Sequence, residues 1–174
     1  MSSGSRIQVN EQVWLSVLKA ADKAQCVCLL NDRDMYERLL RVPHPYRDAD
    51  FEQFLTIAAE ATRKHGHPVH FAIRHEAHGL IGGFGFEGLC FGHRVELGYW
   101  LGKPYWGQGI MTDVVRVAAE FAFEQWNLVR ITARVFPSNM PPLACWKRTA
   151  FNSKACSRSG CASKASSLMR NCTR

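Results

Sequence analysis

The residues of this chain best suited to chemistry lie in the stretch Lys103–Asp113, which reads KPYWGQGIMTD. Gly107 and Gly109 stand directly before an amphipathic run that begins at Ile110. Glycine permits backbone conformations that turn successive N–H groups toward one point, and a helix N-terminus adds about half a positive charge. The stretch therefore predicts either an anion site suited to a pyrophosphate or a plain strand-to-helix turn, and these residues alone favour neither.

Other familiar motifs are missing or stand in the wrong context. The stretch Gly83–Gly88 reads GFGFEG, but the dinucleotide fingerprint needs a helix after it, and here the strand pattern continues. We therefore interpret its glycines as residues at strand bends. The seven histidines form no HExxH motif, and the seven cysteines form no CxxC pair. We expect no metal site, and the absence of GxSxG and GxxxxGK[ST] argues against the common hydrolases and nucleoside triphosphatases.

The elements that must position these residues form a mixed α/β domain. Alternating apolar residues predict strands and 3–4 spacing predicts helices, and Gly66 ends the third predicted helix. The predicted strands are 13–18, 69–75, 79–90, 93–102 and 128–136, and the predicted helices are 20–32, 33–40, 47–66 and 110–127.

The excess positive charge belongs to one end of the chain. Residues 147–174 hold seven Lys and Arg side chains and no Asp or Glu. Their charge of +7 equals the net charge of the whole chain, so residues 1–146 are neutral. Residues 152–174 also lack an aromatic side chain for base stacking and show no periodicity, so we favour a solvated, disordered basic tail over a nucleic-acid-binding segment. No apolar run reaches the ~20 residues that span a bilayer, and no secretory h-region is present. We expect a cytoplasmic protein with neither nucleic-acid nor membrane partners.

The stretch Trp106–Met111 resembles the coenzyme-A-binding motif [QR]-x-x-G-x-[GA] of the GNAT superfamily of N-acetyltransferases. The window ELGYWLGKPYWGQGIMT, and LLNDRDMYERLLRVPHPYRDADFEQFL before it, are similar to the branch that acetylates ribosomal-protein N-termini and small amines. The resemblance covers roughly residues 12–140. Trp106 stands in place of the usual Gln or Arg, and Met111 in place of a small residue. The resemblance implies a mostly antiparallel central sheet flanked by helices.

The resemblance also implies roles for individual residues. Backbone N–H groups of the turn would hold the pyrophosphate of acetyl-CoA, and the strand edge would pair with its pantetheine arm. Asn139 matches an Asn that hydrogen-bonds the pantetheine. The implied coenzyme-binding residues are Tyr99, Trp100, Leu101, Trp106, Gly107, Gln108, Gly109, Ile110, Met111, Thr112 and Asn139.

Glu96 matches the strand glutamate that acts as general base in some members, taking a proton from the acceptor ammonium. Equally open is a structural role for Glu96, paired with Arg94 or Arg134. His44 and Tyr46 lie in the loop that lines the acceptor side in such enzymes, although we favour turn chemistry for both.

The chain departs from the family after Asn139. Pro142 replaces an expected Ser that is a possible proton donor, and the last strand pair of the fold is missing from the pattern. Cys145–Lys147 must be encoded TGY-TGG-AAR, and reading one base earlier forces Leu-Glu, as the family expects. We hypothesise that residues from about Pro141 onward come from a shifted reading frame. The nucleotide sequence tests this, because the shifted frame must encode a string such as VLEKDGF.

These observations predict a GNAT domain over 1–151 and a basic Ser/Cys-rich tail over 152–174. The expected activity is transfer of an acetyl group from acetyl-CoA, without a metal, to a primary amine by direct attack. The alternative is a catalytically impaired acyl-CoA-binding remnant, because a sheet without its last strands exposes an unpaired edge. The acceptor, the general acid and the choice between monomer and homodimer stay open.

Overall fold

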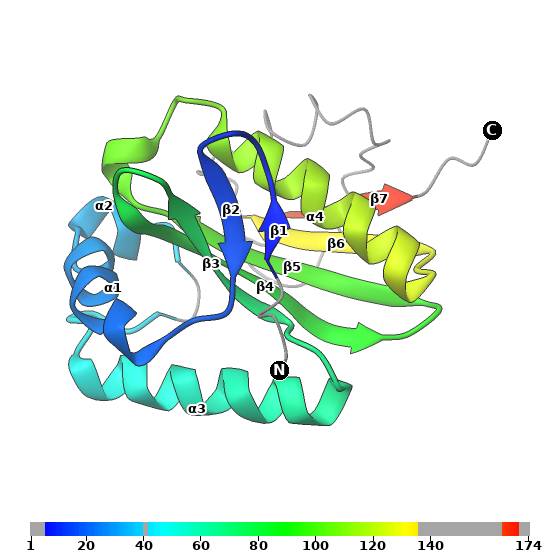
Figure 1. Ribbon diagram of the computed structural model, residues 1–174, viewed down its shortest axis with the longest axis horizontal. Coiled ribbons are helices and arrows are strands. Elements are labelled where there is room, and N and C mark those ends of the chain that lie inside the picture. The colour runs from blue at the N-terminus through cyan, green and yellow to red at the C-terminus, as the bar shows by residue number, and fades with distance from the viewer. Residues whose placement is uncertain (1–5, 40–41, 136–164, 171–174) are drawn as a thin grey trace. The chain divides into compact units, whose positions relative to one another are not determined.

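The computed structural model describes residues 6–39, 42–135 and 165–170 (Figure 1). The chain divides into two compact units, Met1–Gly85 with Tyr99–Gln108, and Phe86–Gly98 with Gly109–Arg174. The strands are β1 (Ile7–Gln8), β2 (Val13–Ser16), β3 (His70–His75), β4 (Gly79–Cys90), β5 (Arg94–Leu101), β6 (Arg130–Val135) and β7 (Ala165–Arg170). The helices are η1 (Ala20–Asp22), α1 (Lys23–Leu30), α2 (Arg33–Tyr36), α3 (Asp48–His65), η2 (Lys103–Tyr105) and α4 (Ile110–Trp126).

The first unit is built on an antiparallel run of strands, in which β1 pairs with β2, β2 with β3 and β3 with β4. A β-bulge shifts the β3–β4 register between Ile73 and Arg74. The sequence predicted β2, β3 and β4, but β1 is too short to show an alternating pattern. The GFGFEG stretch lies inside β4, so its reading as strand rather than nucleotide loop is confirmed.

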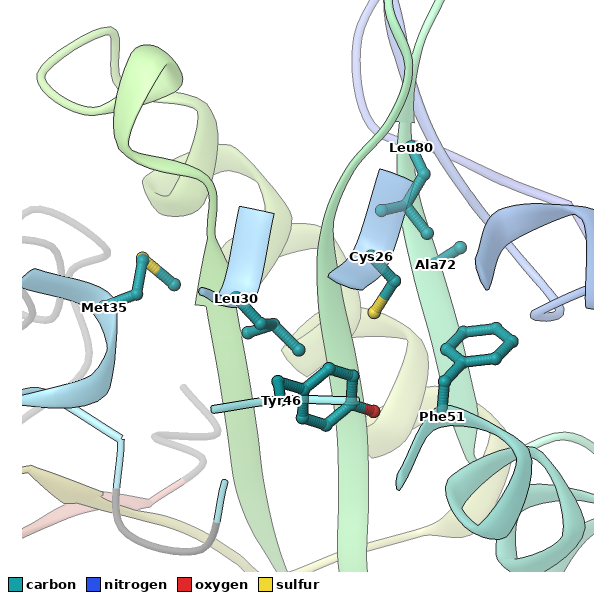
Figure 2. Packing of buried hydrophobic residues seen from close by; sticks show 7 residues of the cluster. All are labelled: Cys26, Leu30, Met35, Tyr46, Phe51, Ala72 and Leu80. Atoms are coloured by element: carbon teal, nitrogen blue, oxygen red, sulfur yellow. The ribbon is translucent and has the colours of Figure 1, made fainter. Parts of the chain in front are cut away.

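Helices α1, α2 and α3 of this unit enclose an apolar cluster. Helix α3 begins where the Asp50 carboxylate accepts a hydrogen bond from the Arg47 N–H (2.7 Å) and ends at Gly66, whose φ of 76° is left-handed. Figure 2 shows Tyr46 and Cys26 among the buried side chains of this cluster. The cluster consists of Cys26, Leu30, Met35, Tyr46, Phe51, Ala72 and Leu80.

A buried ion pair ties β3 to the start of the helical layer. Arg74 donates from both terminal nitrogens to the two carboxylate oxygens of Asp22, each at 2.8 Å, and its Nε donates to Ser16 Oγ at 2.6 Å. The side chains are only 14% and 8% exposed. Such a two-point pair fixes the relative orientation of its elements as well as their distance.

The second unit contains a parallel strand–helix–strand arrangement. Residues Arg94–Leu97 of β5 pair in parallel with Arg130–Ala133 of β6, and α4 forms the crossover between the two strands. A parallel pair needs a crossover of this kind. The helix buries the predicted apolar stripe, with Val114, Val115 and Ala118 fully inaccessible to solvent.

Strand β7 pairs antiparallel with β6 over its whole length, from Arg130↔Arg170 to Val135↔Ala165. The expectation that the C-terminal tail contributes no strand is therefore wrong for residues 165–170. Ladder hydrogen bonds use main-chain groups, so a segment without apolar alternation can still cover a strand edge. The other residues of the predicted tail lie outside the described ranges, as does the junction near Pro141. Within those ranges no helix has both the length and the apolar character required to cross a membrane.

Candidate functional site

The glycine turn leads into α4 as the sequence predicts. Helix η2 ends at Tyr105 with Trp106 as its C-cap, and Gly107 and Gly109 follow with φ values of 77° and 79°. Gly109 is the N-cap of α4. Residues with a side chain rarely adopt this left-handed conformation, so the turn requires glycine at both positions. Among the residues that the structure describes, a Cβ added to either glycine would meet no atom within 4 Å beyond its chain neighbours, so the turn is open on that side.

The backbone N–H groups of this turn divide into two sets. Those of Thr112 and Asp113 both donate to the Gly109 carbonyl, at 2.9 and 3.2 Å. The five N–H groups from Gly107 to Met111 have no acceptor among the residues that the structure describes. Consecutive unpaired donors at a helix N-terminus form a site for an anion. Thr112 is thus the one predicted donor whose N–H is already engaged.

The side chains of the turn hold it in place. Trp106 donates from Nε1 to the Leu101 carbonyl at 2.5 Å, and the Arg38 guanidinium lies 5.1 Å from the centre of the Trp106 ring. Gln108 donates from Nε2 to the Pro104 carbonyl at 3.1 Å. The first bond ties the turn to the last residue of β5, and the second ties it to η2. Trp106 and Gln108 therefore fix the turn through their side chains and leave its main chain exposed.

The end of β5, where the pantetheine was expected to pair, is packed closely against β4. A Cβ at Gly82 would lie 2.5 Å from the Trp100 carbonyl oxygen, and one at Gly83 would overlap the Trp100 indole. On the other side of the strand, Tyr99 stacks on Phe84 with the rings nearly parallel. Gly83 therefore admits the Trp100 indole and Gly82 admits the Trp100 main chain, which are more specific reasons than the strand bends inferred from sequence.

Glu96 lies on β5 in the second unit, half-buried and opposite Thr132 of β6. Its strand neighbours Val95 and Leu97 are buried on the opposite face. Glu87 of β4 is on the same face as Glu96, since a Cβ at Gly98 would lie 3.8 Å from Glu87 Cγ and residues 96 and 98 share a strand face. The sequence did not single out Glu87, although the hairpin between β4 and β5 places it there.

Arg94 was considered only as a partner of Glu96, but it registers with Arg130 of β6. Among the described residues Arg94 forms no ion pair. The Arg134 side chain, the other partner considered for Glu96, lies outside the described part. The juxtaposition of Arg94 and Arg130 depends on the parallel register across a crossover, for which the sequence carries no local signal.

The loop residues His44 and Tyr46 take structural positions. Tyr46 is 6% exposed, and its main chain exchanges two hydrogen bonds of 2.8 Å with the Asn31 side-chain amide. The His44 ring lies against the Tyr36 ring, with the ring centroids 4.9 Å apart and the planes tilted by 32°. Asn139 lies outside the described residues. Within those residues, no three His, Cys, Asp or Glu side chains form a group able to hold a metal.

Comparison with known proteins gives concordant results. A family model described as the acetyltransferase (GNAT) domain matches residues 12–152. Uncharacterized N-acetyltransferase p20 of Bacillus licheniformis is 40% identical over 50 residues, 29% of this chain and 28% of that protein. Probable N-acetyltransferase YjcK of Bacillus subtilis (strain 168) is 36% identical over 62 residues, 36% of this chain and 34% of that protein. The matched region thus spans about a third of these curated relatives.

Solved structures show the same fold. RimL, a ribosomal alpha-N-protein acetyltransferase solved in complex with coenzyme A, has a TM-score of 0.82 at 13% identity, covering 95% of this chain and 98% of that one. A ribosomal-protein-S5-alanine acetyltransferase from Vibrio fischeri has a TM-score of 0.80 at 19% identity, covering 97% of both chains. At such identities the likeness concerns the fold: a mixed α/β architecture with a sheet flanked by helices.

Proposed function

Because the chain belongs to the GNAT family of acetyltransferases, we propose that it transfers an acetyl group from acetyl-CoA to a primary amine within a ternary complex. One observation carries the proposal: two left-handed glycines open α4 and leave five consecutive N–H groups, Gly107 to Met111, without an acceptor in the described part of the chain. These donors suit the two negative charges of a pyrophosphate.

The strand before the turn suits the extended part of the coenzyme. The pairing of β5 with β6 comprises Arg94–Leu97, while β5 itself continues to Leu101. Main-chain groups of Tyr99–Leu101 would pair with the amides of the pantetheine arm, in effect adding a strand. The Trp100 indole packs against Gly83 of β4 on this segment.

Glu96 is the residue proposed to prepare the acceptor. Its carboxylate takes a proton from the acceptor ammonium, directly or through one water, so that the nitrogen lone pair is free. The amine then attacks the thioester carbonyl, the new C–N bond forms, and the C–S bond breaks with the electron pair leaving on sulfur. The coenzyme thiolate takes up a proton, and the products are an amide and coenzyme A.

Two measurements test the proposal. Isothermal titration calorimetry with acetyl-CoA should give saturable heat, and absence of binding would refute the coenzyme site. Thiol release from acetyl-CoA with a panel of primary amines should then show turnover. The Glu96→Gln variant should keep the coenzyme affinity and lose about 10²–10⁴-fold in rate, the usual contribution of a general base.

The same measurements identify the alternative, a GNAT remnant that binds acyl-CoA without turnover. Saturable binding together with no thiol release for any amine supports that alternative. It also removes the assignment of Glu96 as a general base in this chain.

A further inference from the structure

Two arginines stand side by side on the face of the second unit that carries Glu96. Arg94 of β5 and Arg130 of β6 occupy the same register position of a parallel strand pair, and the next position on that face holds Glu96 and Thr132. Val95, Leu97 and Ile131 are buried on the opposite face. Neighbouring strands lie about 4.8 Å apart, so the two side chains leave the sheet close together.

Neither guanidinium is neutralised within the described part of the chain. No ion pair or side-chain hydrogen bond of Arg94 or Arg130 is formed there, and Arg130 Nε is buried without a hydrogen-bond partner among the described residues. A buried, unpaired N–H of a charged group carries a desolvation penalty. Two like charges at adjacent positions add repulsion. Both costs are relieved if an anion binds between the two guanidinium groups.

We propose that Arg94 and Arg130 bind a carboxylate of the acceptor, so that the preferred acceptor is a peptide whose amino terminus is followed closely by an acidic residue. The proposal rests on the function proposed above, with the reacting amine at Glu96. Residues two positions apart on a strand are separated by about 6.6 Å. An extended peptide advances about 3.3 Å per residue, so an acidic side chain at its second or third residue reaches the arginine pair.

The charges on this face also orient the peptide. Glu96, with Glu87 on the neighbouring strand, attracts the ammonium and repels the carboxylate, whereas the arginine pair does the opposite. A planar guanidinium donates two parallel hydrogen bonds to the two oxygens of a carboxylate, a geometry that a lysine ammonium does not reproduce. A peptide with a basic residue at the same place is disfavoured by repulsion.

The experiment compares matched peptides that differ only at the second and third residues, with Asp, Asn or Lys at those positions. Acetyl transfer is followed by thiol release, and binding by fluorescence anisotropy of the same peptides labelled at their C-termini. We expect the Asp peptide to exceed the Asn peptide about tenfold in kcat/KM and in affinity, which corresponds to about 1.4 kcal/mol. The Lys peptide should be the weakest.

Variants connect this preference to the arginines. Arg94 is exposed, so Arg94→Gln removes one charge without opening the core, and the Asp-to-Asn ratio should fall toward one. Arg94→Glu should reverse the order and favour the Lys peptide. Arg116→Gln is the matched control, because this exposed arginine of α4 already pairs with Glu120 at 3.5 Å and should leave the ratio unchanged.

The outcomes separate this inference from the proposed function. Equal values for Asp, Asn and Lys peptides, with thiol release from all three, overturn the acidic preference and leave the acetyltransferase intact. An acidic preference that persists in Arg94→Glu also overturns it. If no peptide is acetylated, the anisotropy series still decides, since selective binding lost in Arg94→Gln supports the arginine pair and unselective binding refutes it.

Discussion

The contact between Gly83 and Trp100 makes a quantitative prediction. In Gly83→Ala the new Cβ would lie 3.0 Å from Cε2 and 3.2 Å from Cδ1 of the indole, and closer still to its Nε1. Carbon atoms that do not bond to each other prefer about 3.5–4.0 Å, so either the ring or the strand must move. Overpacking of this kind costs about 1–3 kcal/mol. At about 2–4 °C per kcal/mol for a chain of this size, the melting temperature should fall by about 2–12 °C.

Unfolding in urea is monitored by far-ultraviolet circular dichroism rather than by tryptophan fluorescence, because Trp100 itself is replaced in the partner variant. Gly83→Ala should cost much less in a Trp100→Leu background, giving a coupling free energy of about 0.5–3 kcal/mol. Gly98→Ala is the control and should change the free energy of unfolding little, since within the described part of the chain a Cβ there would meet only Glu87 Cγ, at an ordinary contact distance of 3.8 Å. If the two losses at Gly83 and Trp100 simply add, the close approach is not what requires glycine.

Three further outcomes follow from the described structure. Gly109→Ala forces a side chain into a φ of 79°, so it should lower the free energy of unfolding by about 1–2 kcal/mol and weaken acetyl-CoA binding in calorimetry. The control Gly88→Ala, at a φ of 58°, should lower the stability of the protein without lowering its affinity for acetyl-CoA. Equal losses of affinity in the two variants would contradict the role of the turn in binding. Burial, with the nearby Asp22 carboxylate, raises the pKa of the Cys26 thiol to about 12, so mass spectrometry should find it unalkylated by iodoacetamide until the protein unfolds. The Lys103 ammonium lowers the pKa of Asp34 through a hydrogen bond and through its charge. The pair therefore stabilises the folded protein at pH values above the ordinary carboxyl pKa of 3.8, and this stabilisation is lost as the pH falls through the lower pKa of the folded state. An NMR titration in which Lys103→Met leaves the pKa of Asp34 unchanged would contradict this interaction.

The elements nearest the turn were predictable because their signals are local. Alternation along β5, the two glycines and the 3–4 stripe of α4 each report on residues within one or two turns of chain. Local patterns also sufficed to reject GFGFEG as a nucleotide loop.

What the sequence could not predict depends on pairing between distant segments. The meeting of Arg94 with Arg130 requires the parallel register across α4, and a slip of one residue would place Arg130 on the other face. The need for glycine at position 83 arises from Trp100, a residue on another strand. The main-chain pairing of β7 with β6 leaves no trace in apolar periodicity.

The buried ion pair between Arg74 and Asp22 restricts which substitutions related sequences can carry at these two positions. Losing one partner leaves a buried charge uncompensated, at about 3–5 kcal/mol, whereas exchanging both for apolar residues of similar volume can be neutral. Each single replacement is therefore an unfavourable intermediate between two tolerable sequences. Arg74 also donates to Ser16 Oγ, so these three positions, far apart in the chain, are expected to change together between related genes or not at all.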